Sequence, residues 1–301
     1  MIQHPELPKP IIVQIIGGLG NQMFQYAAGR ALSLKLSCPL LLDVSGFAGY
    51  GLHQGFELSR VFGCKTEIAT EEEIHALLGW RSHPAARKIL MRPSLAMLHG
   101  STLVVEPHFH YWPGISEVSH NTYLVGYWQS EKYFSEVADT LRADFIFRGS
   151  LSSQNAELAK RIGQTMAVSL HVRRGDYASN PKTNAAHGLC SIEYYREAVL
   201  YMAEHIEHPE FFIFSDDIAW VKSNLEIDFP CWYVDQNKGA ESYNDMRLMS
   251  LCRHHIVANS SFSWWGAWLN PNPDKLVVAP KKWFANGSNA ADLFPAGWLL
   301  L

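Results

Sequence analysis

The chain has 301 residues, of which 48% are hydrophobic and 18% are charged, and its formal net charge at pH 7 is −4. This composition excludes a disordered or fibrous chain, because there is enough apolar surface to form a packed core. The negative balance excludes a general attraction to nucleic acid or to an anionic membrane, so any anion must be bound by a local cluster of cations. At roughly 100–200 residues per domain, the length favours two domains.

The five cysteines are odd in number, and no two of them form a C-x-x-C pair. This usage is typical of reduced thiols and favours neither a disulfide framework nor a zinc site. No basic stretch precedes an apolar segment at the N-terminus, and the apolar run Ile11–Ile16 is far shorter than the roughly 20 residues that span a bilayer. We therefore expect a cytoplasmic protein.

The chain begins with a strand–helix–strand pattern. The β-branched run Ile11–Ile16 predicts a buried strand, the apolar spacing predicts a helix from Gln22 to about Leu36, and Pro39–Asp43 predicts a second strand. The next predicted elements are a helix opened by the capping box Thr70–Glu73 and ending near Leu78, a strand at Tyr123–Trp128 and a helix near Ser130–Asp139. Residues 80–120 are rich in His, Pro and aromatics and fit no element.

A second alternation of helices and strands starts near residue 155. The predicted strands are Met166–Val172, Phe211–Ser215, Cys231–Val234, His255–Ala258 and Leu276–Ala279, and the predicted helices are Gln154–Ile162, Ser191–Ile206, Glu241–Cys252 and Ser261–Leu269. Such alternation predicts an α/β fold with a parallel sheet in each of two Rossmann-type domains. We place the boundary near residue 150, giving domains 1–150 and 151–301, with the last helix packing back on the first domain. Ligands of such folds bind at the carboxyl ends of the strands, here in a cleft between the facing sheets.

The segment His171–Tyr177 follows the strand Met166–Val172. Because a strand alternates its faces, His171 and Arg173 share one side and Arg174 points to the other, while Gly175 permits an abrupt turn. Two arginines beside a glycine turn suit a phosphate-bearing ligand, since guanidinium groups bind phosphate oxygens bidentately. The alternative is that an arginine only pairs with Asp176.

Two carboxylates follow the strand Phe211–Ser215. Together with Ser215, Asp216 and Asp217 can bind a metal or accept hydrogen bonds from a base or ribose. The alternative is a helix N-cap followed by an acidic first turn. The chain contains no D-x-D triplet, which disfavours a metal-dependent sugar-nucleotide site.

The segment Asn259–Gly266 joins a strand to a helix. The hydroxyls of Ser260 and Ser261, and the free N–H groups at the helix start beside Phe262, form an anion site suited to phosphate. The alternative is an ordinary capping motif. The tryptophans that follow are expected to pack the helix on the sheet.

The glycine-rich segment Gly17–Gln22 follows the first strand. Glycines at this place are typical of dinucleotide-binding proteins, and Asp43 stands where a ribose-binding acid is expected. The pattern breaks at its third glycine position, which is Met23. The other interpretation is that Gly18 and Gly20 allow close approach to a sugar while Asn21 and Gln22 hydrogen-bond its hydroxyls.

The chain resembles the bacterial α-1,2-fucosyltransferases of glycosyltransferase family 11, within the inverting fucosyltransferase superfamily. The similar strings, in family order, are GGLGNQMFQYA at 17–27, GYWQS at 126–130, HVRRGDY at 171–177, FSDD at 214–217 and NSSFSWWGAWLN at 259–270. The resemblance therefore covers nearly the whole chain.

This resemblance implies a GT-B fold in which the first domain faces the acceptor and the second binds the nucleotide sugar. It implies GDP-β-L-fucose as donor, no required metal or other cofactor, and transfer to the 2-hydroxyl of a terminal β-galactoside with inversion. The expected partners are thus GDP-fucose and a galactose-terminated glycan, with membrane contact at most peripheral and through a lipid-linked acceptor, and no nucleic acid.

The resemblance also assigns roles to residues. Arg173 would neutralise the departing diphosphate, and Asn21 would lie against the fucose. Asp176 is the first candidate for a general base, and the alternative is that the leaving phosphate takes the proton without a dedicated base. The expected donor contacts are His171, Arg174, Ser215, Asp216, Asp217, Asn259, Ser260, Ser261, Phe262, Gly18 and Gly20. The expected acceptor contacts are Gln22, Trp128 and Gln129. An NAD-binding oxidoreductase and a non-catalytic carbohydrate-binding protein remain the alternative functions.

Overall fold

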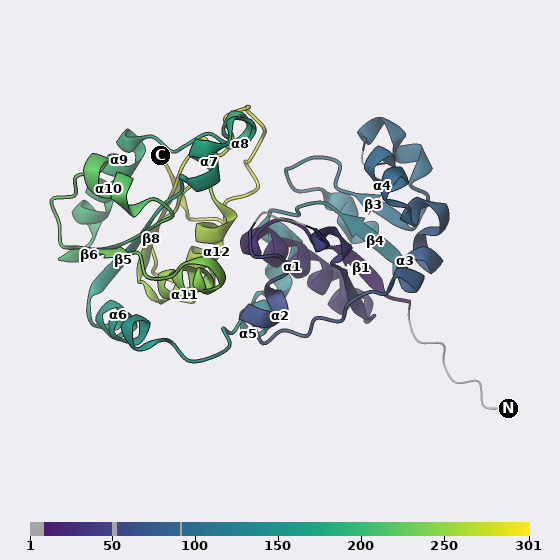
Figure 1. Ribbon diagram of the computed structural model, residues 1–301, viewed down its shortest axis with the longest axis horizontal. Coiled ribbons are helices and arrows are strands. Elements are labelled where there is room, and N and C mark those ends of the chain that lie inside the picture. Colours follow the sequence, from purple (N-terminus) through teal and green to yellow (C-terminus); the bar gives the residue numbers. More distant parts are fainter. Residues whose placement is uncertain (1–8, 50–52, 91) are drawn as a thin grey trace. The chain divides into compact units, whose positions relative to one another are not determined.

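The structure is a computed structural model that describes residues 9–49, 53–90 and 92–301 (Figure 1). The chain divides into two compact units, Met1–Arg148 with Ala291–Leu293, and Gly149–Ala290 with Phe294–Leu301. Each unit contains one sheet in which the paired strands run parallel, with helices packed against it. The predicted α/β class is therefore confirmed.

The first unit contains a four-stranded sheet with the order β2-β1-β4-β3. Its strands are β1 (Ile11–Gln14), β2 (Leu40–Asp43), β3 (Leu103–Val105) and β4 (Thr122–Val125). Its α-helices are α1 (Leu19–Leu36), α2 (Leu58–Val61), α3 (Glu71–Leu78), α4 (Pro84–Leu90) and α5 (Ala138–Asp144). Its 3-10 turns are η1 (Ser45–Phe47), η2 (Gly79–Ser82), η3 (Pro93–Leu98), η4 (Pro113–Glu117), η5 (Glu131–Tyr133) and η6 (Ser135–Val137).

Helix α1 lies close against β1 because of a small residue in its middle. A Cβ atom on Gly29 would stand 2.4 Å from Cγ2 of Val13, well inside van der Waals contact. The helix contacts both β1 and β2, and its start follows the tight turn at Gly17, whose φ is +80°. This packing fixes the glycine-rich turn at the carboxyl end of β1.

The second unit contains a six-stranded sheet with the order β10-β9-β8-β5-β6-β7. Its strands are β5 (Met166–Val172), β6 (Pro209–Ser215), β7 (Cys231–Val234), β8 (His254–Ile256), β9 (Val277–Ala279) and β10 (Leu299–Leu300). Its helices are α6 (Ser153–Gln164), α7 (Gly175–Ser179), α8 (Pro181–His187), α9 (Ile192–His205), α10 (Ile218–Asn224), η7 (Gly239–Glu241), α11 (Tyr243–Leu251) and α12 (Ser261–Leu269).

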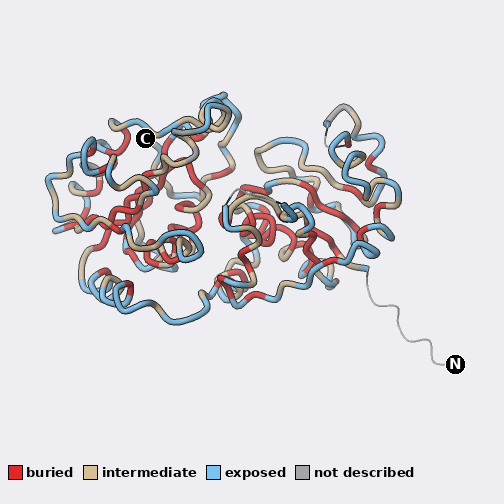
Figure 2. Tube along the Cα trace, in the orientation of Figure 1, coloured by how far each residue is buried: buried red, intermediate tan, exposed pale blue. Residues whose placement is uncertain are grey.

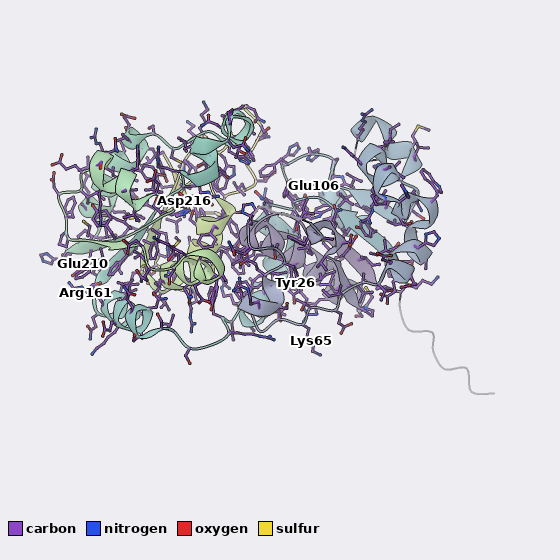
Figure 3. All side chains as sticks on the ribbon, in the orientation of Figure 1. Tyr26, Lys65, Glu106, Arg161, Glu210 and Asp216 are labelled. Atoms are coloured by element: carbon purple, nitrogen blue, oxygen red, sulfur yellow. The ribbon has the colours of Figure 1, made fainter. Side chains whose placement is uncertain are left out.

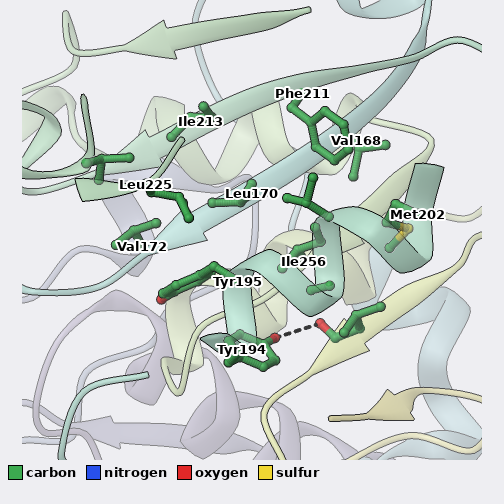
Figure 4. Packing of buried hydrophobic residues seen from close by; sticks show 14 of the residues in the cluster. Val168, Leu170, Val172, Tyr194, Tyr195, Met202, Phe211, Ile213, Leu225 and Ile256 are labelled. Carbon is green, nitrogen blue, oxygen red and sulfur yellow. Dashed lines mark hydrogen bonds between the residues drawn. The ribbon is translucent and has the colours of Figure 1, made fainter. Parts of the chain in front are cut away.

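Strand β5 lies in the middle of this sheet and is buried along almost its whole length (Figure 2). One of its faces packs against α9 (Figure 4). The cluster includes Val168, Leu170, Val172, Tyr195, Met202, Phe211, Ile213 and Leu225. Tyr194 from α9 carries its hydroxyl into this apolar region and donates to the carbonyl of Val257 at 2.6 Å. The core thus fixes the position at which β5 ends.

Two predicted elements of the first unit were wrong in extent or type. The strand predicted at Tyr123–Trp128 ends at Val125, and Trp128, with a φ of +55°, lies in the turn that follows. The helix predicted near Ser130–Asp139 is replaced by the turns η5 and η6, and a helix forms only from Ala138.

The return of the last helix to the first domain stays a prediction. In the described part of the chain no helix follows α12, which belongs to the second unit. The segment that joins the first unit is Ala291–Leu293. Asp292 holds it there, since its Oδ2 accepts from the backbone N–H of Tyr111 at 3.1 Å and its carboxylate pairs with Lys132.

A buried ion pair links β2 to α4 in the first unit. The Asp43 carboxylate is 2.6 Å from Nη1 of Arg87, and it also accepts a hydrogen bond from the Tyr123 hydroxyl. Burial alone would raise the pKa of Asp43, but the hydrogen bonds from Ser45, Tyr123 and Arg87 hold it below its ordinary value. The pair is therefore ionised and locks the α4 region onto the sheet.

We predict that Asp43→Asn lowers the free energy of unfolding by about 3 kcal/mol, because it leaves the half-buried Arg87 guanidinium without its counter-charge. The matched control is Asp139→Asn, which removes a fully exposed carboxylate paired with Arg142. Chemical denaturation should find the control indistinguishable from the parent. If Asp43→Asn and Asp139→Asn changed the free energy of unfolding equally, the stabilising role of the Asp43–Arg87 pair would be contradicted.

Candidate active site

Three of the segments singled out in the sequence come together at one edge of the second unit's sheet. Strand β5 pairs with β6 on one side and with β8 on the other, and all three run parallel. The residues that follow them are therefore neighbours: Arg173 after β5, Asp216 after β6, and Ser260 after β8. This edge therefore carries the guanidinium groups of Arg173 and Arg174 and the start of helix α12.

Asp216 binds the end of β5 through two polar contacts and packs closely against Gly175. Its Oδ2 is 2.7 Å from Nη1 of Arg173, and its Oδ1 accepts from the backbone N–H of Arg174 at 2.8 Å. A Cβ atom on Gly175 would stand 2.5 Å from Oδ2, so only glycine leaves room for this carboxylate. The guanidinium of Arg173 also lies 5.3 Å from the ring centroid of Tyr177. Arg173 is thus held in one place by a carboxylate and an aromatic ring.

Arg174 is held separately by the start of α10. Its Nε lies 3.3 Å from Oδ2 of Asp217, and its guanidinium carbon lies 3.6 Å from the Trp220 ring centroid. Asp217 also caps α10, because its Oδ1 accepts from the backbone N–H of Trp220 at 3.1 Å. Ser215 completes the turn by accepting from the Asp217 N–H at 3.0 Å. The two arginines therefore pair across strands with Asp216 and Asp217. The side chain of Asp176, in α7, lies outside the described part of the structure.

His171 is a neutral histidine at the end of β5. Its ring is 6% exposed, and its Nδ1 is buried with no hydrogen-bond partner among the described residues. Burial and the neighbouring Arg173 charge lower the pKa of His171 to about 3, so it carries no charge at physiological pH. Its ring lies 6.0 Å from that of Phe262 at the start of α12. It can donate or accept a hydrogen bond but cannot serve as a cation.

The start of α12 is capped from within. Ser260 is the N-cap, and its Oγ accepts from the backbone N–H of Phe262 at 3.3 Å. The hydroxyl of Ser263 accepts from the N–H of Ala258 at 3.2 Å. Ser261 and Phe262 are half-buried. The helix behind them is apolar, with Trp264, Trp265 and Trp268 buried as expected. The capping interpretation and the anion interpretation are compatible here, because the side chain satisfies one N–H and leaves the helix-start dipole in place.

Asn259 lies just beyond the end of β8, and its predicted contact with the donor stays a prediction. Its side chain is buried, and its amide group donates to the carbonyls of His187, Gly188 and Trp283 at 3.0–3.3 Å. Its Oδ1 lies 3.4 Å from Sγ of Cys190. Asn259 therefore joins the end of α8 and the 283 segment to the end of β8 and stabilises this edge of the sheet.

In the first unit, Asn21 and Gln129 form a hydrogen-bonded pair. Nε2 of Gln129 donates to Oδ1 of Asn21 at 2.7 Å. Asn21 lies in the first turn of α1, beside Gly18 and Gly20, and Gln129 follows β4. The polar groups of two predicted segments thus meet at the carboxyl edge of this sheet.

The predicted acceptor contacts of Gln22 and Trp128 stay predictions, and the structure gives Gln22 a role within the protein. Both side chains are fully buried. Nε2 of Gln22 donates to the carbonyls of Gly17 and Gly55 at 2.9 and 2.8 Å, and its Oε1 accepts from the N–H of Glu57 at 2.9 Å. The amide group of Gln22 therefore joins two loops through hydrogen bonds.

The structure argues against a dinucleotide site in the first unit. Asp43, the acid that such a site needs for the ribose, is 1% exposed and is engaged by Arg87 and Tyr123. A ribose hydroxyl cannot reach it without opening the buried ion pair.

Sequence reasoning missed two carboxylic acids. Glu106 follows β3 and accepts from the backbone N–H groups of Tyr127 at 2.7 Å and Trp128 at 3.1 Å (Figure 3). Burial raises the pKa of Glu106 to about 7, against the lowering effect of these two donors. Gly126 makes room for it, since a Cβ there would stand 2.5 Å from Glu106 Cβ. Glu106 therefore anchors the turn that presents Gln129.

The second missed acid is Asp245 in α11. Burial raises the pKa of Asp245 to about 7, and the Asn237 amide, which donates to it at 2.7 Å, lowers it. Asn155 donates in turn to Asn237 at 2.7 Å, and Gln236 donates to Asn155 at 2.8 Å. Gln236 and Asn237 follow β7, which pairs with the strand that carries Asp216, while Asn155 comes from α6. Amides and a carboxyl group in such a cluster can hydrogen-bond the edge of a nucleobase.

None of the helices in the described ranges combines the length and apolar character that crossing a bilayer requires. Within the same ranges, no group of three or more His, Cys, Asp or Glu side chains is arranged to hold a metal ion.

The fold of the chain is that of a GT-B glycosyltransferase. It matches the crystal structure of fucosyltransferase NodZ from Bradyrhizobium with a TM-score of 0.51 at 13% identity, over 87% of this chain and 94% of that one. The expected GT-B architecture is confirmed at the level of the fold.

Residues 112–301 match the sequence profile of Glycosyl transferase family 11. The chain is 36% identical over 291 residues to an alpha-1,2-colitosyltransferase of Escherichia coli, covering 96% of this chain and 98% of that protein. It is 34% identical over 298 residues to the O-antigen biosynthesis glycosyltransferase WbnK of Escherichia coli, covering 95% and 98%. The chain belongs to glycosyltransferase family 11.

A more distant relative is the galactoside alpha-(1,2)-fucosyltransferase 1 of Saimiri boliviensis boliviensis. The identity is 25% over 154 residues, which is 48% of this chain and 42% of that protein. The relatives together support a transferase of fucosyl or colitosyl groups, and the oxidoreductase alternative is set aside.

We predict that the stability of Glu106→Gln relative to the parent increases as pH rises from 5 to 8. The folded-state pKa of about 7 exceeds the ordinary value near 4.3. The contribution of the Glu106 pKa shift to the free energy of unfolding is therefore fully present below about pH 4, and it is lost as pH rises through 7. Glutamine has no proton to lose.

Thermal unfolding of both proteins at four pH values tests this prediction, with the exposed Glu136→Gln as control. A difference between Glu106→Gln and the parent that stays constant with pH would rule it out.

Proposed function

We propose that this chain transfers L-fucose from GDP-β-L-fucose to the 2-hydroxyl of a terminal β-galactoside, with inversion to an α-linkage and without a required metal. The observation that carries the proposal is Arg173, oriented by Asp216 at the carboxyl end of β5, on the same sheet edge as the start of α12. The relatives that transfer fucosyl or colitosyl groups to form α-1,2 linkages support the type of bond.

The difficult step is cleavage of the bond between the anomeric carbon and the β-phosphate oxygen. Negative charge develops on the departing GDP while positive charge develops on the sugar ring. The Arg173 guanidinium and the N–H groups at the start of α12 are the fixed groups that would stabilise that diphosphate. Because these groups are already oriented, little reorganisation is needed as charge develops.

The remaining contacts with the donor and the acceptor follow from the family resemblance. Ser260, Ser261 and Phe262 would surround the phosphates, and His171, Asp216 and Asp217 would lie near the guanine and ribose. Asn21 and Gln129 would hydrogen-bond sugar hydroxyls. The acceptor hydroxyl attacks the anomeric carbon from the face opposite the phosphate and loses its proton, for which Asp176 is the proposed base. The expected setting is the cytoplasm, where a lipid-linked galactoside would be the acceptor.

We predict that Arg173→Ala lowers kcat by about 10²–10³, because one fixed donor to the developing charge is lost. Arg173→Lys should recover little, since an ammonium cannot bind Asp216 and a phosphate with the planar geometry of a guanidinium.

The control is Arg161→Ala. Arg161 is also an arginine of the second unit that pairs with a carboxylate, Glu210 at 2.9 Å, and lies over an aromatic ring, Trp232 at 4.3 Å (Figure 3). The mechanism fails if a folded Arg173→Ala protein turns over near the parental rate, or if Arg161→Ala loses as much activity.

We predict that GDP-fucose is a better donor than GDP-colitose and that EDTA leaves transfer unchanged. Colitose lacks the 3-hydroxyl of fucose, so a donor site that hydrogen-bonds this hydroxyl discriminates between the two sugars. The measurement is the turnover of both donors with a panel of galactosides, with and without EDTA, followed by linkage analysis of the product.

A preference for GDP-colitose would reassign the donor within the same family. Loss of activity in EDTA that returns with a divalent cation would overturn the metal-independent mechanism.

A further inference from the structure

Large apolar side chains are exposed on three successive elements of the first unit. They are Trp80 on η2, Ile89 on α4, and Met97 and Leu98 on η3, and the exposed fractions of Trp80 and Met97 are 63% and 96%. Helix α4, labelled in Figure 1, contacts both η2 and η3, so the three elements are neighbours in space. A folded protein seldom gathers exposed apolar groups in this way without a binding role.

The exposure is built into the way α4 packs. Its inward position Leu90 is buried in the same core cluster as Ile74 and Leu78 of α3. The half-buried Arg87 is held by Asp43 in the ion pair described above. Helical periodicity then directs Lys88 and Ile89 outward, and both are exposed. An isoleucine therefore occupies the solvent face of a helix that the core holds in a fixed orientation.

The same region has an unusual charge. The chain as a whole has a net charge of −4, yet the stretch from Ile74 to Val105 contains no Asp or Glu. Its cationic side chains are Arg81, Arg87, Lys88 and Arg92. Arg81 is directed inward, where its guanidinium donates to the carbonyl of Leu78 at 3.1 Å and to Oγ1 of Thr102 at 2.8 Å. Lys88 and Arg92 are exposed.

We propose that Trp80, Ile89, Met97 and Leu98, together with Lys88 and Arg92, form a surface that binds an anionic lipid bilayer. Below it is called the α4 surface. Its composition fits the interfacial zone of a membrane, where Trp and long aliphatic side chains enter the headgroup region and Lys and Arg contact lipid phosphates.

The charge favours a bilayer over a second copy of this chain. A protein with a net charge of −4 that pairs by an isologous contact brings two basic α4 surfaces face to face, which is repulsive. An anionic bilayer offers negative charge over the whole α4 surface, and each basic group near it contributes about fivefold to binding (about 1 kcal/mol per Lys or Arg).

The test is co-sedimentation of the full chain with vesicles of phosphatidylcholine, with and without 30% phosphatidylglycerol. We expect binding to the anionic vesicles that weakens as salt is raised. Lys88→Glu/Arg92→Glu should reduce it by roughly 30-fold or more, and Trp80→Gln/Met97→Gln should reduce it at both low and high salt.

Two variants serve as matched controls. Lys281→Glu/Lys282→Glu makes the same change of charge at two exposed lysines of the second unit, and Leu200→Gln removes an exposed leucine from α9. Both should bind vesicles as the parent does. Thermal unfolding and turnover of a soluble acceptor by each variant confirm that it is folded.

Three outcomes would overturn the proposal. The first is failure of the parent to bind anionic vesicles, and the second is an equal loss of binding in the lysine control. The third is parental self-association, measured by sedimentation velocity, that Trp80→Gln/Met97→Gln abolishes while vesicle binding is unchanged. That result would assign the α4 surface to a protein contact. None of these outcomes depends on which donor or acceptor sugar the protein uses.

Discussion

The contact on which the rest of the site depends is the one between Asp216 and the end of β5. One carboxylate takes a backbone N–H, pairs with the Arg173 guanidinium, and fills the space that a side chain at position 175 would need. It fixes the end of one strand relative to the next and orients the arginine in the same contact. Positioning and charge are thus supplied by one group, which is why a glycine, an arginine and an acid from two separate strands must occur together.

Two buried side-chain amides, those of Gln22 and Asn259, likewise fix neighbouring segments relative to one another. Gln22 joins the glycine turn to the Gly55–Glu57 segment, and Asn259 joins the end of β8 to two other segments. An amide can donate and accept at once, so it crosslinks loops whose backbone groups would otherwise be buried without partners. Some polar residues after strands therefore hold loops together, and in the proposed function others would contact a ligand.

The sequence predicted the buried strands of the second unit but not which polar residues hold loops together. The apolar runs of the second unit predicted β5 and β6 closely, because buried parallel strands have a local signal. Strand β3 has only three residues and gave none. The roles of Gln22 and Asn259 could not be predicted, because their partners lie up to 72 residues away in the chain. Glu106 was missed because its significance comes from burial beside a turn on another strand, which no spacing of residues reveals.

The pairing of charges at the sheet edge also constrains how an anion can bind there. Arg173 and Arg174 are balanced by Asp216 and Asp217, so these four side chains sum to zero. His171 adds no charge, since burial and Arg173 keep its pKa near 3. In the proposed function, a diphosphate would therefore share Arg173 with Asp216. A guanidinium can do this because its five N–H groups point along different directions in one plane, so one edge can stay on the carboxylate while another meets a phosphate. In the proposed function, the ion pair would keep the arginine in position between turnovers, and the helix start at Ser260 would supply additional positive potential for an anion.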